Sequence, residues 1–293
     1  KSGRILSGQT IDSLLYSVSH IDLLTVGLNC SFGARDLKPY LSSLGRLARY
    51  YISAHPNAGM PNQFGEYDQT PEIMVEQIKE YLNEGLVNVI GGCCGTTPQH
   101  IKAIADAVET LRRTSPDTFK PHQRAAAVHE MRLSGLDGLV VDKKEKRFYN
   151  VGERTNVAGS RKFVRLISEK NYDEALDIAR AEVEAGADII DVNMDDAMLD
   201  AEAEMVRFLN LLAAEPDVAR LPVMIDSSSW DVIKEALKHV GGKAIVNSIS
   251  LKEGAETFKE RARYIKSFGA AVIVMAFDEE GQATTLERRK AVC

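Results

Sequence analysis

Three cysteines stand where apolar segments of the chain end. Cys30 follows residues 23–28 (LLTVGL) and Asn29, while Cys93 and Cys94 follow residues 87–90 inside the sequence Gly91-Gly92-Cys93-Cys94-Gly95. Zinc accepts sulfur ligands in a tetrahedron, and three protein ligands leave the fourth position to a substrate. The pattern therefore predicts a zinc site that activates a substrate thiol. The alternative is that these are small buried core residues, since free cysteines are often buried.

A second set of polar residues lies at or just after other apolar segments. Its members are Asn156, Asp191, Asn193, Asp226, Asn247 and Asp278. A carboxylate can accept two neighbouring N–H groups, and amides both donate and accept, so together they suit a flat heterocycle such as a pterin. Gly159, Ser160 and Arg161 could hold the rest of that ligand. Each position alone is also explained by helix capping, as at Asp226, Ser227 and Ser228.

The elements that would position the cysteines alternate between strand and helix. We expect strands at residues 23–28, 51–54 and 87–90, and helices at residues 37–50, 70–83 and 99–113. Because the chemically unusual residues follow strands, as they do at the carboxyl ends of barrel strands, a parallel sheet covered by helices is expected. Ligands supplied by separate strands favour a closed (β/α)8 barrel over an open sheet.

The alternation stops at residues 116–147 and then resumes. Those residues are expected to form a linker with a short hairpin at residues 131–133 and 139–141. Five further strand–helix units follow. Their strands are expected at residues 148–151, 188–192, 223–225, 244–246 and 271–276. The sequence thus predicts an α/β protein with two TIM-type (β/α)8 barrels in tandem, both incomplete in this chain, at residues 1–115 and 148–293.

Composition narrows the functional classes. The chain has 293 residues, of which 44% are hydrophobic and 27% charged, and its net charge is −6. A mildly acidic chain without a long basic run is a poor match for nucleic acid or an anionic membrane. No apolar run of about 18 residues is present, so no membrane span is expected. Four cysteines in this length favour reduced thiols and a cytoplasmic location.

The motifs together resemble one family. Residues 27–30 (GLNC) and 91–98 (GGCCGTTP) resemble the homocysteine-binding domain of cobalamin-dependent methionine synthases. Residues 152–160 (GERTNVAGS) resemble the opening of the folate domain of that family, and further matching motifs stand at residues 191–195, 225–228, 246–250 and 275–279. The resemblance covers nearly the whole chain in order.

This resemblance implies a function and a set of residues. It implies methyl transfer from 5-methyltetrahydrofolate through cobalamin to zinc-activated homocysteine, giving methionine and tetrahydrofolate. Cys30, Cys93 and Cys94 would bind the zinc. Asp226 and Asn247 would contact the pterin, with Gly159, Ser160 and Arg161 in the folate loop and Asn156 nearby. No Asp-x-His-x-x-Gly motif occurs, so the cobalamin is expected on a separate domain of the same full-length protein.

Two alternatives stay open at this point. The second region alone would suit a corrinoid-protein or pteroate-type pterin-binding transferase, although the cysteine-bearing region disfavours that interpretation. A non-catalytic binding fragment is the other alternative, because the expected barrels are incomplete and the fragment alone is not expected to be a competent enzyme. Neither the proton donor to the folate nor any other catalytic residue is identified by the sequence.

Overall fold

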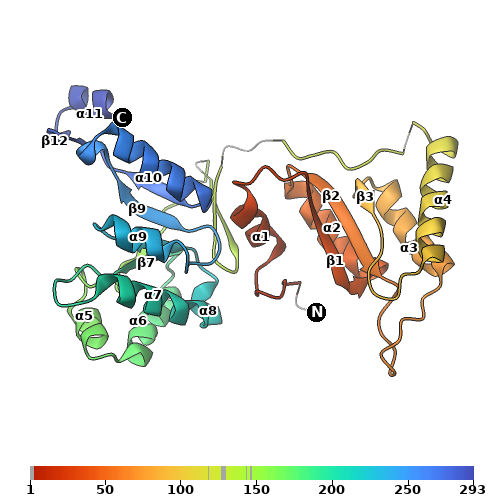
Figure 1. Ribbon diagram of the computed structural model, residues 1–293, viewed down its shortest axis with the longest axis horizontal. Coiled ribbons are helices and arrows are strands. Elements are labelled where there is room, and N and C mark those ends of the chain that lie inside the picture. The colour runs from red at the N-terminus through yellow and green to blue at the C-terminus, as the bar shows by residue number, and fades with distance from the viewer. Residues whose placement is uncertain (1–2, 118, 127–129, 143, 146) are drawn as a thin grey trace. The chain divides into compact units, whose positions relative to one another are not determined.

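The computed structural model describes residues 3–117, 119–126, 130–142, 144–145 and 147–293. The chain divides into two compact units. One spans residues 22–129 and is called the 22–129 unit. The other joins the segment up to residue 21 with residues 130–293 and is called the 130–293 unit (Figure 1).

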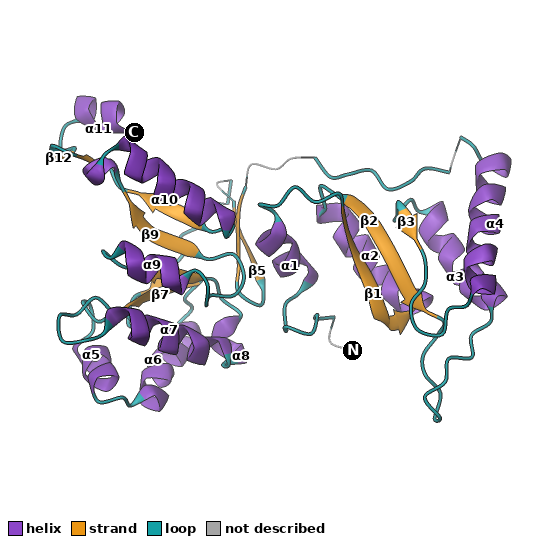
Figure 2. Cartoon of the chain, in the orientation of Figure 1, coloured by secondary structure: helices purple, strands orange, loops and turns teal. Residues whose placement is uncertain are grey.

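The 22–129 unit is a parallel sheet with helices between its strands (Figure 2). Its strands are β1 (Thr25–Gly33), β2 (Tyr51–Asn57) and β3 (Val89–Ile90), and its helices are α2 (Ala34–Leu47), α3 (Pro71–Asn83) and α4 (Pro98–Thr114). The strand order β1-β2-β3 follows the chain order. The three predicted strands and three predicted helices are therefore confirmed, with ends that shift by a few residues.

The helices of this unit begin at the residues that the sequence indicates. Thr70 precedes α3, and its side chain accepts the backbone N–H of Ile73, with Pro71 at the first helical position. At α4, Thr97 and His100 form a reciprocal capping box. These contacts satisfy N–H groups that a helix otherwise leaves unpaired at its start. They fix where each helix leaves the loop that follows a strand.

Large apolar side chains on one face of α2 pack against the sheet. Leu37, Leu41 and Leu44 recur at helical spacing and are buried, as is Ile52 of β2. Burial of a side chain of this size contributes about 1.5–3 kcal/mol. The core of the 22–129 unit therefore holds the strand ends, and the loops beyond them, in place.

The predicted linker at residues 116–147 is shared between the units. Residues up to 129 belong to the 22–129 unit, where Ala125 N donates to Ala48 O, and Asn88 Nδ2 donates to His122 O. Residues from 130 onward belong to the other unit. Residues 118, 127–129, 143 and 146 of this predicted linker lie outside the described residues. The expected domain boundaries at residues 115 and 147 stay predictions.

The 130–293 unit contains a five-stranded parallel sheet in the order β10-β9-β8-β7-β6. The strands of this sheet are β6 (Val151–Gly152), β7 (Ile189–Asn193), β8 (Val223–Asp226), β9 (Ile245–Ile249) and β10 (Ala271–Val274). Two further pairs of strands in this unit are β4 (Met131–Ser134) with β5 (Gly138–Val141), and β11 (Phe277–Asp278) with β12 (Gly281–Gln282). Its helices are α1 (Ile11–Val18), α5 (Arg161–Ser168), α6 (Tyr172–Glu184), α7 (Ala201–Ala213), α8 (Pro216–Ala219), α9 (Trp230–Ala236), the 3-10 turn η1 (Leu251–Glu253), α10 (Ala255–Ser267) and α11 (Leu286–Val292).

The strand order of this sheet bears on the fold class. Each parallel strand pairs with the strand before it along the chain, with no reversal of direction. A doubly wound sheet reverses its order at a switch point, whereas a barrel does not. The α/β class with parallel sheets is confirmed, and the sequential order favours a barrel. Closure into eight strands stays a prediction.

The core of this unit lies between the sheet and its helices. Phe163 of α5 and Phe208 of α7 meet edge to face, with ring centroids 5.1 Å apart, and both are fully buried. Ile190, Ile225 and Val246 belong to the same cluster and come from three adjacent strands. Aromatic pairs of this geometry add about 0.5–1.5 kcal/mol beyond their burial.

The hairpin β4–β5 packs against the amino ends of the parallel strands. Its Leu133 contacts Ile189, Met224 and Ile245, each at the start of a sheet strand. Helix α1 lies on the hairpin, where Ser13 Oγ donates to Gly135 O at 2.6 Å. The predicted hairpin is confirmed, while helices α1, α5 and α8 were not predicted.

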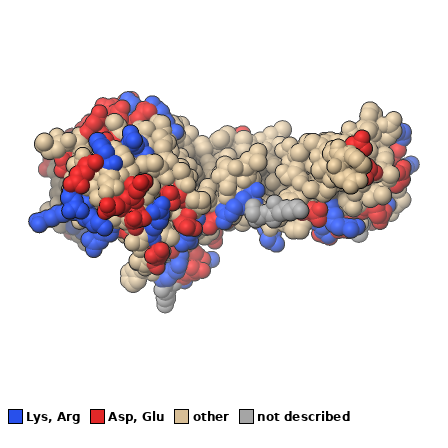
Figure 3. All heavy atoms as spheres, turned by 90° about the horizontal axis from the view of Figure 1, so that it is seen from below, with Lys and Arg blue, Asp and Glu red and all other residues tan. Residues whose placement is uncertain are grey.

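The surface carries mixed charge. On the face drawn in Figure 3, acidic and basic side chains are interspersed. Among the described residues, no helix is long and apolar enough to cross a bilayer.

Candidate metal centre and polar cluster

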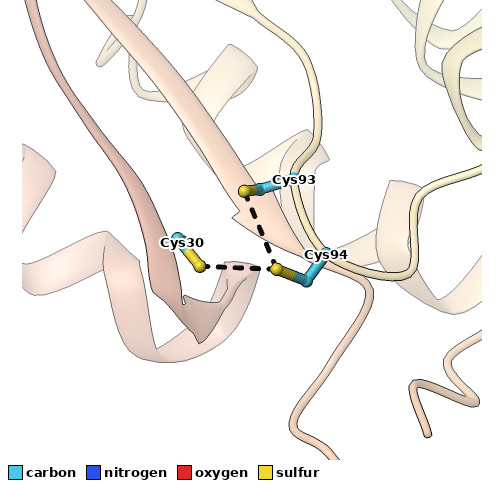
Figure 4. Close-up of side chains that lie close together, drawn as sticks. All are labelled: Cys30, Cys93 and Cys94. Carbon is cyan, nitrogen blue, oxygen red and sulfur yellow. Dashed lines mark hydrogen bonds between the residues drawn. The ribbon is translucent and has the colours of Figure 1, made fainter.

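The side chains of Cys30, Cys93 and Cys94 point toward one another (Figure 4). The Sγ atoms of Cys30 and Cys94 are 3.5 Å apart, and those of Cys93 and Cys94 are 4.0 Å apart. All three lie within 4.8 Å of one another. Zinc–sulfur bonds of about 2.3 Å in a tetrahedron require sulfur atoms about 3.8 Å apart. The three sulfurs therefore have the spacing of three zinc ligands.

An irregularity in β1 brings Cys30 to this point. The parallel register of β1 with β2 runs from Thr25 to Asn29 and then shifts before Gly33. Within that break, Cys30 has φ +61° and Ser31 has φ +65°. Left-handed backbone at residues other than glycine is uncommon and is kept only where the surroundings hold it. The predicted strand ended before Cys30, whereas the observed strand includes it.

Backbone contacts fix the other two cysteines. Cys93 N donates to Pro56 O at 2.8 Å, and Cys94 N donates to the side-chain oxygen of Asn57 at 3.2 Å. Both acceptors lie in β2, the strand between β1 and β3. The middle strand thus holds the cysteine pair opposite Cys30.

Gly95 is required by the fold of this loop. It has φ +76°, and a Cβ placed on it would lie 2.2 Å from Cβ of Tyr67. Only glycine combines that dihedral angle with so close an approach. Gly95 therefore lets the loop after Cys94 pack closely against Tyr67.

The electrostatics of the trio favour a bound cation. All four cysteines of the chain are free thiols. The backbone N–H of Ser31 lowers the pKa of Cys30, whereas the pKa of Cys94 is raised by its hydrogen bonds with Cys30 and Cys93. Thiols this close cannot all ionise unless a positive charge compensates them. A divalent ion would supply that charge.

A pocket lies beside Cys93. It is lined by Gly27, Leu28, Asn29, Ser53, His55, Gly92 and Cys93. The pocket thus offers one sulfur together with amide, hydroxyl and imidazole side chains. The imidazole belongs to His55 of β2.

The second site is a network of carboxylates and amides in the 130–293 unit. Asn156 Nδ2 donates to Asp191 Oδ2 at 2.9 Å and to Asp226 Oδ2 at 3.0 Å. Asn193 Nδ2 also donates to Asp226 Oδ2, at 3.0 Å. No hydrogen bond to Asp226 Oδ1 is found within the described part of the chain. The network therefore orients the Asp226 carboxylate and leaves one of its oxygens for a ligand.

The register of the sheet explains how these residues meet. Asn156 bridges to Asn193, Asn193 pairs with Asp226, and Asp226 pairs with Asn247. Carboxyl ends of adjacent parallel strands lie at one edge of a sheet. Asn247 thus lies opposite Asp226, and the predicted convergence of Asn156, Asp226 and Asn247 at neighbouring positions is observed.

Both carboxylates of the network have shifted pKa values. Asp191 is 2% exposed, and burial, followed by the charge of Asp226, raises its pKa to about 7, against the lowering effect of Asn156. Burial also raises the pKa of Asp226, while the amides of Asn193 and Asn156 lower it. A ligand that donates hydrogen bonds to Asp226 would stabilise the ionised form further.

Asp195 ties two of the loops together. Its Oδ1 accepts from Ser227 Oγ at 2.6 Å, and its Oδ2 accepts from Ser228 N at 2.6 Å and from Ser228 Oγ at 2.7 Å. The contact joins the loop after β7 to the loop after β8, so it holds Asn193 near Asp226.

The other residues predicted to bind the ligand are Gly159, Ser160, Arg161 and Asp278. Ser160 caps α5 by accepting the N–H of Phe163, and Arg161 is the exposed first residue of that helix. Gly159 N donates to Asn156 Oδ1 at 3.2 Å, so it supports the network through its backbone. Asp278 is paired with Arg288. Neither Arg161 nor Asp278 joins the hydrogen-bonded network.

Comparison with known families finds two matches, one on each side of residues 109–151. Residues 1–108 match the family described as Homocysteine S-methyltransferase, and residues 152–292 match the family described as Pterin binding enzyme. The cysteine trio lies in the first match and the polar network in the second.

Proposed function

Since the chain carries a homocysteine S-methyltransferase domain followed by a pterin-binding domain, in the order of the N-terminal region of methionine synthase, we propose that its two sites serve one overall methyl transfer. The methyl donor is 5-methyltetrahydrofolate and the acceptor is homocysteine, giving tetrahydrofolate and methionine. The methyl group passes between the sites on a cobalamin that another domain of the same full-length protein binds.

Cys30, Cys93 and Cys94 hold zinc in this proposal. Zinc bound there would stabilise the thiolate of homocysteine at neutral pH. The fit rests on the sulfur spacing and on the need of three close thiols for a compensating charge. The pocket beside Cys93 takes the remainder of homocysteine, where His55, Ser53 and Asn29 supply polar contacts.

Asp226 and Asn247 bind the pterin ring in this proposal. Asp226 Oδ1 accepts from the pterin, while Asn156 and Asn193 hold Oδ2 and so fix the carboxylate plane. Asn247 pairs with Asp226 in the sheet register. Its amide both donates to and accepts from an edge of the ring that carries donors and acceptors. Gly159 and Ser160 shape the adjoining loop, and Arg161 at its end meets the anionic tail of the folate.

The free thiols support a reducing compartment. We propose the cytoplasm for that reason, since thiols persist there without forming disulfides.

The observation that carries the proposal is the meeting of three sulfurs at zinc-ligand spacing, one from β1 and two from the loop after β3. Metal analysis of reduced protein should find about one zinc per chain. Cys30→Ala should abolish it, whereas Cys293→Ala, which removes the exposed cysteine outside the trio, should not. Reduced, folded wild-type protein without zinc would refute the metal site.

Two half-reactions of the full-length protein separate the sites. Transfer from methyltetrahydrofolate to free cob(I)alamin should fail in Asp226→Asn and persist in Cys30→Ala. Transfer from free methylcobalamin to homocysteine should show the reverse pattern. If Cys30→Ala abolished both transfers equally while the protein stayed folded, two independent sites would be excluded. Folate binding without any transfer would favour a non-catalytic role.

A further inference from the structure

Glu182 is a carboxylate buried behind the polar network. It lies near the end of α6 and is 8% exposed. A Cβ placed on Gly152 would lie 2.8 Å from Glu182 Cδ, so the missing side chain of Gly152 makes room for the carboxyl group. A buried carboxylate is costly unless it is hydrogen-bonded. Its position therefore needs an explanation.

The contact that Glu182 makes is with the backbone of the loop after β6. Arg154 N donates to Glu182 Oε1 at 2.7 Å. Burial raises the pKa of Glu182 overall, while the N–H groups of Arg154 and Thr155 lower it. Glu182 Oε2 has no hydrogen-bond partner among the residues that the structure describes. The side chain is thus committed to this loop.

The opposite side of the same loop is held by β7. Thr155 Oγ1 donates to Asp191 O at 2.6 Å, and Asn193 N donates to Thr155 O at 3.2 Å. The residue that follows is Asn156, whose single amide nitrogen reaches both Asp191 and Asp226. An amide that serves two acceptors at about 3 Å tolerates little backbone movement.

We propose that Glu182 is the positioning residue for Asn156 and, through Asn156, for Asp226, the carboxylate that is proposed to bind the pterin. This rests on the proposed function of the polar network. Glu182 of α6 accepts a hydrogen bond from the backbone of Arg154, and β7 makes hydrogen bonds with Thr155 from the other side. The Asn156 amide is therefore fixed before any ligand binds. Glu182 touches neither substrate nor the reacting atoms.

The test measures the affinity of the full chain for tetrahydrofolate by calorimetry. Glu182→Ala should weaken binding about tenfold, because the loop loses its anchor and binding must order it again. Glu182→Gln should restore most of the affinity, since its amide oxygen can still accept from Arg154 N. Zinc content should be unchanged in both variants.

Glu204→Ala is the matched control. Glu204 is 5% exposed in the same unit, but its carboxylate accepts from Lys170 Nζ and from Tyr172 Oη, not from the loop. Equal losses in Glu204→Ala and Glu182→Ala would mean that any buried carboxylate matters through stability alone, and would overturn the proposal. Gly152→Ala would displace the Glu182 carboxyl group by adding a Cβ on β6. It should therefore weaken tetrahydrofolate binding, which gives a second test if Glu182→Ala fails to fold.

A double-mutant cycle with Asn156→Ala separates positioning from a general effect. If Glu182 acts through Asn156, the double variant should bind about as weakly as Asn156→Ala alone. Fully additive losses would overturn the positioning role while leaving the pterin site intact. If Asn156→Ala bound tetrahydrofolate as tightly as the wild type, the proposed pterin site would fail, and the role of Glu182 with it.

Discussion

Titration of Asp191 should make the 130–293 unit less stable as the pH rises from 5 to 8. This carboxyl group is 2% exposed, and its pKa is raised from 3.8 to about 7, chiefly by burial. In the unfolded chain the group regains its ordinary pKa. Between those two values the folded state binds more protons than the unfolded state, so the free energy of unfolding falls with rising pH.

The magnitude follows from the two pKa values. With 3.8 for the unfolded and about 7 for the folded chain, Asp191 costs about 2 kcal/mol at pH 5 and about 4 kcal/mol at pH 8. The stability of the unit should therefore drop by about 2–3 kcal/mol over that range from this group alone. Above pH 8 the cost levels off, because the group is then ionised in both states.

Asp191→Asn removes the titration while keeping an oxygen that can accept from Asn156 Nδ2. The variant should gain stability relative to the wild type as the pH rises, by about 2–3 kcal/mol between pH 5 and pH 8. Urea unfolding followed by the fluorescence of Trp230, the single tryptophan of the chain, reports on this unit. Asp217→Asn, an exposed carboxyl change in the same unit, is the control. A constant difference between variant and wild type at every pH would refute the reasoning.

Three further changes test other parts of the structure. Gly95→Ala should sharply reduce zinc affinity, since the added Cβ would overlap Tyr67. Gly65 also has a positive φ, +80°, but open space around it, so Gly65→Ala should keep its zinc. Equal loss of zinc in both variants would contradict the steric argument. Asp195→Ala should weaken tetrahydrofolate binding about tenfold by calorimetry, because the loops after β7 and β8 separate; unchanged affinity would show that the loops are held otherwise. Tyr81→Phe should lower stability in urea by about 1 kcal/mol, because the buried hydroxyl donates to the backbone at the start of α2; a larger loss would point to a packing defect.

Much of the arrangement could be read from local sequence. Thr70-Pro71 and Thr97-Pro98 carry the capping chemistry that starts α3 and α4, and both helices begin there. Apolar segments followed by polar or sulfur residues marked the strand ends. These signals are local because hydrogen bonds at a helix start and alternation within a strand involve residues close in the chain.

Helix α5 shows what local sequence left out. The sequence places Gly159, Ser160 and Arg161 in a ligand loop, and the structure adds a helix that begins at Arg161 with Ser160 as its cap. A cap residue and a ligand residue are the same residue types, so the sequence alone could not separate them. The burial of Phe163 against Phe208 decided for the helix.

The sequence by itself determined the chemistry available: three thiols and a set of carboxylates and amides, each at or just after the end of an apolar segment. Only the tertiary structure decided their spacing and charge. The sulfur distances depend on a break in the register of β1. The pKa of Asp191 depends on burial by surrounding elements, and the position of the Glu182 carboxyl group depends on the space that Gly152 leaves. Strand-end position is a property of one segment, whereas distance, desolvation and contact arise between segments far apart in the chain.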